Sequence, residues 1–234
     1  MEEFLTATFW VAVAQIIMID ILLGGDNAVV IALACRQLPD HQRTKGIMWG
    51  TAGAIILRVA LVAFAVTLLQ IPFLKFTGGI LLLWIGYKLM VQTEDDGGHE
   101  LEASDKLWAA VKTIIVADIA MSVDNVIAIA GAAGQVEAAH HQFGYIVFGL
   151  LVSIPLIVGG SQIVLYLIDR FPWIVTLGAG LLGWIAGGMI FSDPGLIKQF
   201  GAGIENYATI AGIVAAVGVM LYGEVMKRQK KKKA

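Results

Sequence analysis

The chain has 234 residues, of which 58% are hydrophobic and only 15% carry a charge. A soluble domain normally has about a quarter charged residues, so this composition excludes an ordinary soluble fold. The charges lie in short patches between long apolar runs, which is the pattern of an integral membrane protein. The one cysteine, Cys35, excludes an intramolecular disulfide and a cysteine-rich metal site.

Seven apolar stretches are each close to the ~20 residues that a helix needs to cross a bilayer. The first of them follows an acidic start without a basic residue, so we expect it to be retained as a helix and not cleaved as a signal peptide. The sequence therefore predicts an all-α, polytopic membrane protein that forms a single transmembrane domain. The predicted spans are 9–34, 47–69, 73–91, 108–133, 143–168, 173–191 and 206–225.

Basic residues mark one side of the membrane. They flank the first, third and fifth connections and follow the last span, whereas the connection at 134–142 has no Lys or Arg. Cytoplasmic loops carry the excess of Lys and Arg, so this alternation predicts a protein of the cytoplasmic membrane with its N-terminus outside and its C-terminus inside. The basic residues that carry this prediction are Arg36, Arg43, Lys45, Lys88, Lys106, Lys112, Arg170, Lys227 and Arg228.

Part of the sequence is repeated. Three polar residues of the first span recur at the same spacing in the fourth span: Asp20, Asp26 and Asn27 match Asp118, Asp124 and Asn125. Further along, Pro72, Gly78 and Trp84 recur 100 residues later as Pro172, Gly178 and Trp184. Each copy holds three spans, an odd number, so the second copy must enter the membrane from the opposite side. This predicts an inverted repeat, whose site in secondary transporters lies at the repeat interface near the midplane.

The repeat divides the chain into five parts. Repeat one covers about 9–91 and repeat two about 108–191, and an acidic cytoplasmic loop at about 92–107 joins them. A seventh helix at about 206–225 lies outside the repeat, and a basic cytoplasmic tail follows at 227–234. The tail is most simply an anchor on anionic lipid, and nucleic-acid binding is a poor interpretation of it.

The acidic motifs place carboxylates at several depths. Asp20 and Asp118 fall near the middle of their spans, while Asp26 and Asp124 lie six residues further along. Since the two helices run in opposite directions, these six residues, roughly 9 Å of helix, displace Asp26 toward the cytoplasm and Asp124 toward the exterior. Two central acids flanked by one acid on each side suit a cation that passes a shared site under alternating access.

Carboxylate and carboxamide oxygens are hard ligands, which favour Mn²⁺, Mg²⁺ or Ca²⁺ over Cu⁺ or Zn²⁺. A buried carboxylate without a cation tends to take up a proton, so metal and proton compete and proton antiport is a natural mechanism. We expect no prosthetic group. The predicted metal-pathway residues are Asp20, Asp26, Asn27, Asp118, Asp124 and Asn125.

A structural explanation of these acids needs basic partners inside the membrane. Arg58, in the second span, is the one deep candidate and can neutralise only one acid, so a cation or proton pathway is favoured. Arg58 itself either tunes one Asp, holds the empty site together or recognises an anion. Two weaker features stay open: the acidic loop can collect cations or be a solvated linker, and Glu137, His140 and His141 can bind metal outside or form an ordinary polar loop.

The two motifs resemble those of the TerC family of integral membrane proteins, which is grouped with the LysE superfamily. The residues that carry the resemblance are the runs from Gly24 to Ala32 and from Ser122 to Ala128, and the short seven-span form is similar to the bacillar YjbE/YkoY branch. The resemblance implies Mn²⁺ export, which in some members supplies metal to proteins being secreted, and it carries the expected metal positions onto the six residues named above.

Other functions remain as alternatives. One is export of another cargo in the manner of LysE relatives, either a different divalent cation or an amino acid, for which Arg58 is the one available carboxylate-binding group. Another is a membrane assembly factor that moves no ions and has its activity in the loops. An enzyme is not expected, because no nucleophile-base pair, phosphate loop or zinc signature accompanies the acids. The oligomeric state is open.

Overall fold

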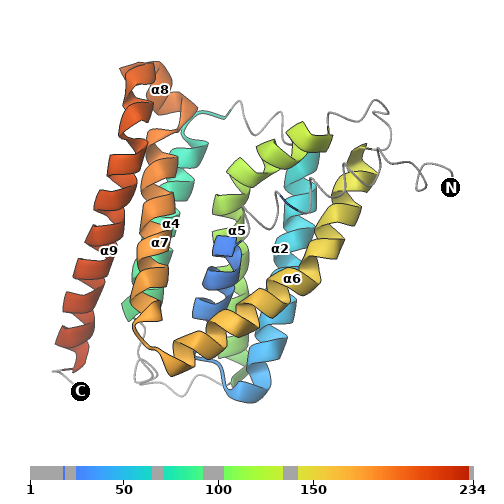
Figure 1. Ribbon diagram of the computed structural model, residues 1–234, viewed down its shortest axis with the longest axis vertical. Helices are drawn as coiled ribbons and strands as arrows, with labels where there is room; N and C mark the ends of the chain where they lie inside the picture. The colour runs from blue at the N-terminus through green and yellow to red at the C-terminus, as the bar shows by residue number, and fades with distance from the viewer. Residues whose placement is uncertain (1–17, 19–24, 65–70, 92–102, 134–141, 232–234) are drawn as a thin grey trace.

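A computed structural model of the protein describes residues 18, 25–64, 71–91, 103–133 and 142–231 (Figure 1). All regular secondary structure in these ranges is helical, as predicted, and no strand occurs in them. The elements are a helix at Gly25–Cys35, α2 (Asp40–Ala63), α4 (Leu74–Val91), α5 (Ala103–Ala133), α6 (Gln142–Arg170), α7 (Ile174–Phe191), α8 (Pro194–Phe200), the 3₁₀ helix η3 (Ala202–Tyr207) and α9 (Ala208–Lys231).

Five helices in the described ranges are long and apolar enough to cross a membrane, which confirms a polytopic membrane protein. They are α2, α4, α6, α7 and the stretch Ala202–Gln229 that contains α9. Helix α5 has 31 residues and carries the second acidic motif. The first predicted span, 9–34, is described only at residue 18 and from residue 25 onward, so the count of seven helices extends outside the described residues.

Two helix starts differ from the prediction: that of α2, and that of α5, which begins at Ala103 and not near residue 108, so that the last residues of the predicted loop at 92–107 are helical. Helix α2 begins at Asp40 and not near residue 47, directly after Pro39, whose backbone sits at φ −53°. Arg43 and Lys45 therefore lie in the first turns of α2, and the first connection is shorter than expected. Helix α8 and η3 were also not predicted, and they fill the segment between α7 and α9.

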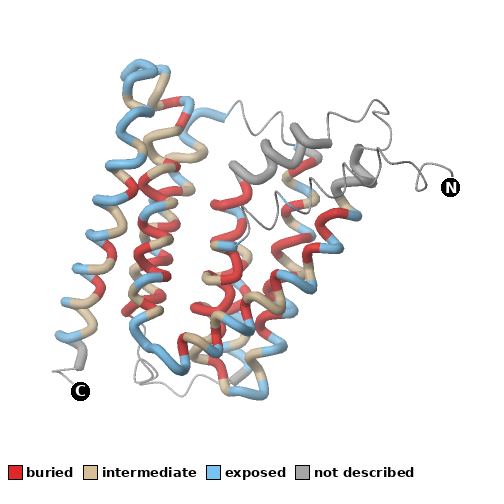
Figure 2. The backbone as a smooth tube through the Cα atoms, viewed as in Figure 1, coloured by how far each residue is buried: buried red, intermediate tan, exposed pale blue. Residues whose placement is uncertain are grey.

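The Gly25–Cys35 helix lies at the centre of the bundle (Figure 1). Its apolar side chains belong to one buried cluster with residues of α4, α5, α6 and α7. On α7, Gly178 makes room for this helix, because a Cβ there would lie 2.9 Å from side-chain atoms of both Val29 and Leu33. Figure 2 shows buried residues facing the inside of the bundle and exposed ones facing out. Many exposed residues are large and apolar, such as Trp84 and Trp184, as a lipid-facing surface requires.

Helices α4 and α7 pack closely and antiparallel. A Cβ on Gly79 would lie 2.7 Å from the carbonyl oxygen of Ala186, and one on Gly86 would lie 3.4 Å from the carbonyl oxygen of Ala179. As the residue number rises on α4 it falls on α7, so the two helices run in opposite directions. Small residues at such contacts let two backbones approach, which is how helices associate in lipid.

One end of the bundle, which we call the basic end, is held by arginines. Arg43 makes an ion pair of 2.6 Å with Asp169 at the end of α6, and Arg36 donates a 2.7 Å hydrogen bond to the carbonyl of Leu89 at the end of α4. The start of α2 and the ends of α4 and α6 therefore meet there. Lys45, Lys88 and Arg170 lie in the adjoining turns of these helices.

Candidate functional site

The centre of the site is a buried ion pair between α2 and α5. Its cation is Arg58, 2% exposed, and its anion is Asp118, 4% exposed. One guanidinium nitrogen of Arg58 donates to Oδ1 of Asp118, and Nε donates to the hydroxyl of Ser122 at 3.2 Å. That hydroxyl in turn donates to Oδ2 of Asp118 at 2.9 Å, so both oxygens of the carboxylate accept a hydrogen bond.

The local sequence explains why these three side chains meet. Asp118 and Ser122 are four residues apart on α5 and so project from the same face. On α2, Gly50 and Gly53 let α5 approach, because a Cβ at these positions would collide with the side chains of Ile114 and Ile115, respectively. Gly46, one turn earlier, lies at ordinary contact distance from Leu107 of α5. The residue numbers rise together on both helices, so α2 and α5 run parallel. This parallel contact brings Arg58 level with Asp118.

The first acidic motif contributes Asp26 and Asn27. The Oδ1 atom of Asp26 accepts a 2.8 Å hydrogen bond from the backbone N–H of Asn27, and Asp26 interacts electrostatically with both Arg58 and Asp118. The structure thus brings one acid of each motif into the same region. Asn27 is 3% exposed, and neither its Oδ1 nor its Nδ2 has a hydrogen-bond partner among the described residues.

Thr51 is a further buried polar residue near the site, and it was not among the predicted site residues. It is 1% exposed, and its hydroxyl has no hydrogen-bond partner in the described part of the chain. It precedes Arg58 by seven residues on α2, so the two side chains share a helix face. The seven-residue spacing from Arg58 was the one sequence signal that could have placed Thr51 near the site. A Thr in an apolar span ordinarily bonds its own backbone, and this made it easy to overlook.

The other predicted residues are only partly covered. Asp20, Glu137, His140 and His141 lie outside the described residues, as does most of the acidic loop. Asp124 and Asn125 belong to the helical backbone of α5, two turns beyond Asp118 in chain order. Within the described ranges, no three His, Cys, Asp or Glu side chains come together as a metal site. The six-residue metal site therefore stays a prediction.

A second buried carboxylate, Asp193, lies at the end of the bundle away from the basic end. It is 0% exposed and caps α8, accepting hydrogen bonds from the N–H groups of Gly195 at 2.7 Å and Leu196 at 3.1 Å. It also accepts from the start of α4, from the N–H groups of Phe73 at 3.2 Å and Phe76 at 3.1 Å. Asp193 thus joins the start of α4 to the loop after α7, and it has a structural role.

The segment around this cap is tightly built. Phe73 has a positive φ of 62°, which is costly for a bulky residue and is held in place by the hydrogen bond to Asp193. A Cβ on Gly195 would lie 2.9 Å from the backbone nitrogen of Phe73, so a side chain at this position would separate α8 from α4.

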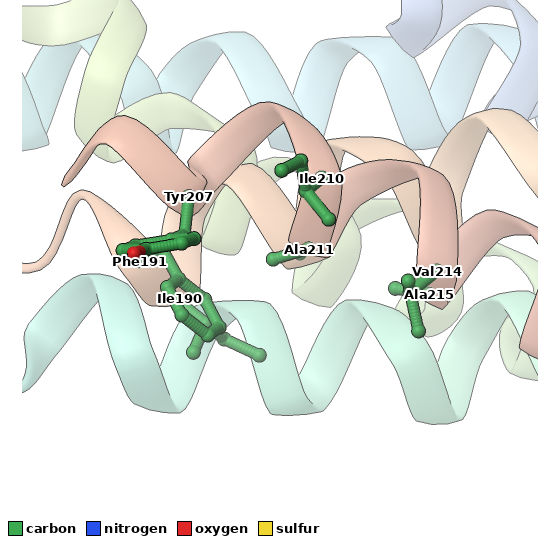
Figure 3. A pocket seen from close by; sticks show the side chains of 8 residues that line it. Ile190, Phe191, Tyr207, Ile210, Ala211, Val214 and Ala215 are labelled. Carbon is green, nitrogen blue, oxygen red and sulfur yellow. The ribbon is translucent and has the colours of Figure 1, made fainter. Parts of the chain in front are cut away.

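An apolar cavity of about 390 Å³ opens between α7, η3 and α9 (Figure 3). Its lining offers aliphatic and aromatic surface and no charged group, so it has no ligand for a cation. The lining residues are Gly187, Ile190, Phe191, Tyr207, Ile210, Ala211, Val214 and Ala215.

The helices and the buried charges define a class: a multi-pass integral membrane protein with an ion pair in its apolar interior. Residues 5–232 match the model of the family described as "Integral membrane protein TerC family". The chain belongs to the TerC family.

Relatives of the chain include membrane proteins of bacteria. The uncharacterized membrane protein YjbE of Bacillus subtilis (strain 168) is 44% identical over 94% of this chain and 98% of its own length. YkoY, from the same organism and also described as uncharacterized, is 27% identical over 70% of this chain and 54% of its own length. The UPF0053 protein YegH of Escherichia coli (strain K12) is 26% identical over 84% of this chain and 40% of its own length. No solved structure matches the fold significantly.

Proposed function

We propose that this protein exports a divalent metal cation, Mn²⁺ above all, across the cytoplasmic membrane in exchange for protons, without a prosthetic group and without catalysing a reaction. One observation carries the proposal. The Asn27 amide is buried with neither polar atom bonded to a described residue, and it directly follows Asp26, the acid on which the charges of Arg58 and Asp118 act. A buried polar group without a hydrogen-bond partner costs free energy. A cation site that uses the Asn27 amide oxygen as a ligand explains why this residue is buried here.

The energetics support a ligand role for Asn27. Burying an amide without a hydrogen bond costs about 1–3 kcal/mol, and no described residue offsets this cost for Asn27, whereas a bound cation would. Carboxamide and carboxylate oxygens together form a hard donor set, which suits Mn²⁺, Mg²⁺ and Ca²⁺. Mn²⁺ is preferred among them because the TerC resemblance implies it, and the same resemblance implies manganese homeostasis and metal supply to secreted proteins.

The proposed architecture is a pair of inverted repeats with the cation site between them. The contacts of α4 with α7 support it. An offset of 100 residues takes Gly79 to Ala179 and Gly86 to Ala186, so the pair Gly79–Ala186 becomes the pair Gly86–Ala179. Two antiparallel helices with such exchangeable contacts are related by a two-fold axis perpendicular to them, which would lie in the membrane plane.

We place the basic end at the cytoplasm. Arg36, Arg43, Lys45, Lys88 and Arg170 gather there, and the excess of Lys and Arg on the cytoplasmic side gives the orientation. The C-terminal tail then lies inside and the N-terminus outside. Asp193 and α8 lie on the external side.

The contacts of Arg58 weigh against an amino acid as cargo. An amino acid needs a cationic group for its carboxylate, so Arg58 would have to exchange both Asp118 and Ser122 for the cargo, whereas a metal cation has to displace it from Asp118 alone. A metal cation needs no such group.

Metal flux into proteoliposomes tests the proposal. Purified protein is reconstituted and uptake of Mn²⁺, Mg²⁺, Ca²⁺ and Zn²⁺ is followed with and without a pH gradient, for wild type and for Asp26→Asn. We expect Mn²⁺ uptake that depends on the pH gradient and is nearly abolished in Asp26→Asn. The matched control is Asp40→Asn, which removes an exposed carboxylate at the start of α2. Absence of Mn²⁺ movement by the wild type under any gradient would contradict the proposal.

A further inference from the structure

Arg58 occupies a place where arginine is expensive. It is the largest of the side chains that are fully buried in the described part of the chain, in a helix that crosses the membrane. A charged residue at such a depth is rare and is usually functional. Two of its contacts show what the charge does: Arg58 binds Asp118 directly and also through the hydroxyl of Ser122.

The same contacts occupy Asp118. Both of its oxygens accept hydrogen bonds, one from the guanidinium and one from the Ser122 hydroxyl. A divalent cation on this carboxylate with Arg58 still in place would put three positive charges beside the two described acids, Asp118 and Asp26. Like charges this close in a low-dielectric interior repel strongly. The arginine and the cation therefore compete for Asp118.

We propose that Arg58 is a tethered competitor of the transported cation: it holds Asp118 while the site is empty, and it must leave that carboxylate when the cation binds. This inference rests on the proposed function, and it adds that Arg58 lowers the affinity of the site for the transported cation. Replacing Arg58 by another cation keeps the charge of Asp118 compensated, whereas removing Arg58 without a replacement leaves a bare carboxylate. The ion pair joins α2 to α5, so cation binding is then coupled to the contact between these two helices.

Arg58 has no counterpart in repeat two, so only one of the two acidic motifs has an arginine as a competitor of the cation. The repeat offsets of 98 and 100 residues take Arg58 to Leu156 and Val158 on α6, so repeat two has no arginine at the equivalent position. The resulting asymmetry lets a cation be held differently on the two sides of the site, although the acidic motifs themselves are alike.

Mn²⁺ binding to the purified full-length protein tests this inference. Binding is measured from the loss of the electron paramagnetic resonance signal of free Mn²⁺ for wild type, Arg58→Gln and Lys112→Gln. The last variant is the matched control, because Lys112 is an exposed base on α5 below Asp118. We expect Arg58→Gln to bind Mn²⁺ about tenfold tighter or more, the factor that corresponds to the lower end of the coupling measured for close charge pairs across a protein interface. Lys112→Gln should bind as the wild type does.

Arg58→Lys decides the question if the glutamine variant does not fold. Lysine keeps the charge but cannot make the two directed hydrogen bonds of the guanidinium, so it should hold Asp118 less firmly and allow Mn²⁺ to bind more tightly than in the wild type. A role in scaffolding alone predicts equal or weaker binding in both variants, and that result would overturn the inference while leaving the transport function standing. Absence of Mn²⁺ binding in the wild type and in every Arg58 variant would contradict the proposed function and this inference together.

Discussion

Two buried carboxylates of this protein are satisfied in different ways. Asp193 accepts four hydrogen bonds from backbone N–H groups at the starts of α4 and α8. Asp118 accepts from two side chains, Arg58 and Ser122. Backbone donors in helices cannot move away without unfolding a turn, whereas side chains can rotate. The comparison separates a carboxylate that fixes the fold from one whose partners can be exchanged for a ligand.

The difference also bears on charge. Asp193 is stabilised by helix N-termini, where backbone dipoles favour an anion without a counter-ion. Asp118 has a full positive charge as its partner, and removal of that charge leaves a vacancy that another cation can fill. Exchange of partners is therefore expected at Asp118 and not at Asp193.

The largest expected effect on stability comes from breaking the ion pair on one side. Asp118→Asn leaves the guanidinium of Arg58 without its counter-charge and should lower the free energy of unfolding by about 3–5 kcal/mol. The double variant Arg58→Gln/Asp118→Asn removes both charges and should recover most of this loss. Thermal unfolding in detergent measures both. A double variant no more stable than Asp118→Asn would show that the two charges are not coupled.

A smaller loss is expected at the cap. Asp193→Ala removes an acceptor shared by two helix starts and should lower the free energy of unfolding by about 2–3 kcal/mol, since each bond to a charged group is worth about 1.5–3 and the donors can regain water at this end. The same unfolding experiment measures it. Mn²⁺ transport per folded molecule should stay within about twofold of wild type. Loss of transport without loss of stability would mean that Asp193 belongs to the cation pathway.

The smallest effect has the opposite sign. Asn27→Leu replaces a buried amide that lacks described partners with an apolar group of similar volume, and should raise the free energy of unfolding by about 1 kcal/mol. Cation affinity should fall at the same time, because an oxygen ligand is lost. The measurements are thermal unfolding without metal and Mn²⁺ binding. A less stable variant with unchanged affinity would assign the amide to the fold.

Local patterns predicted much of the fold. The predicted spans 73–91 and 173–191 agree with α4 and α7 to within one residue, because an apolar run starts just after Pro72 and Pro172 and the pattern ends where the helices end. The predicted start of α2, near residue 47, was wrong because the first turns of this helix are polar. Hydropathy detects only the apolar part of a helix.

The candidate site was predicted less completely. Charge balance identified Arg58 as the one deep base, but a choice of its partner among the acids requires the parallel packing of α2 on α5. Asp193 was missed since its donors include Phe73, 120 residues earlier in the chain. A polar residue between two spans normally indicates a solvated loop, so no local signal distinguishes such a cap.

Mn²⁺ uptake into proteoliposomes that contain equal amounts of folded Asp118→Asn, Arg58→Gln/Asp118→Asn and Asp193→Asn protein tests the central claim most directly. The account predicts that both variants without the Asp118 carboxylate lose nearly all uptake, although the double variant is well folded, and that Asp193→Asn transports within about twofold of wild type. Wild-type uptake by the Arg58→Gln/Asp118→Asn variant would contradict it, because the exchangeable carboxylate would then be dispensable.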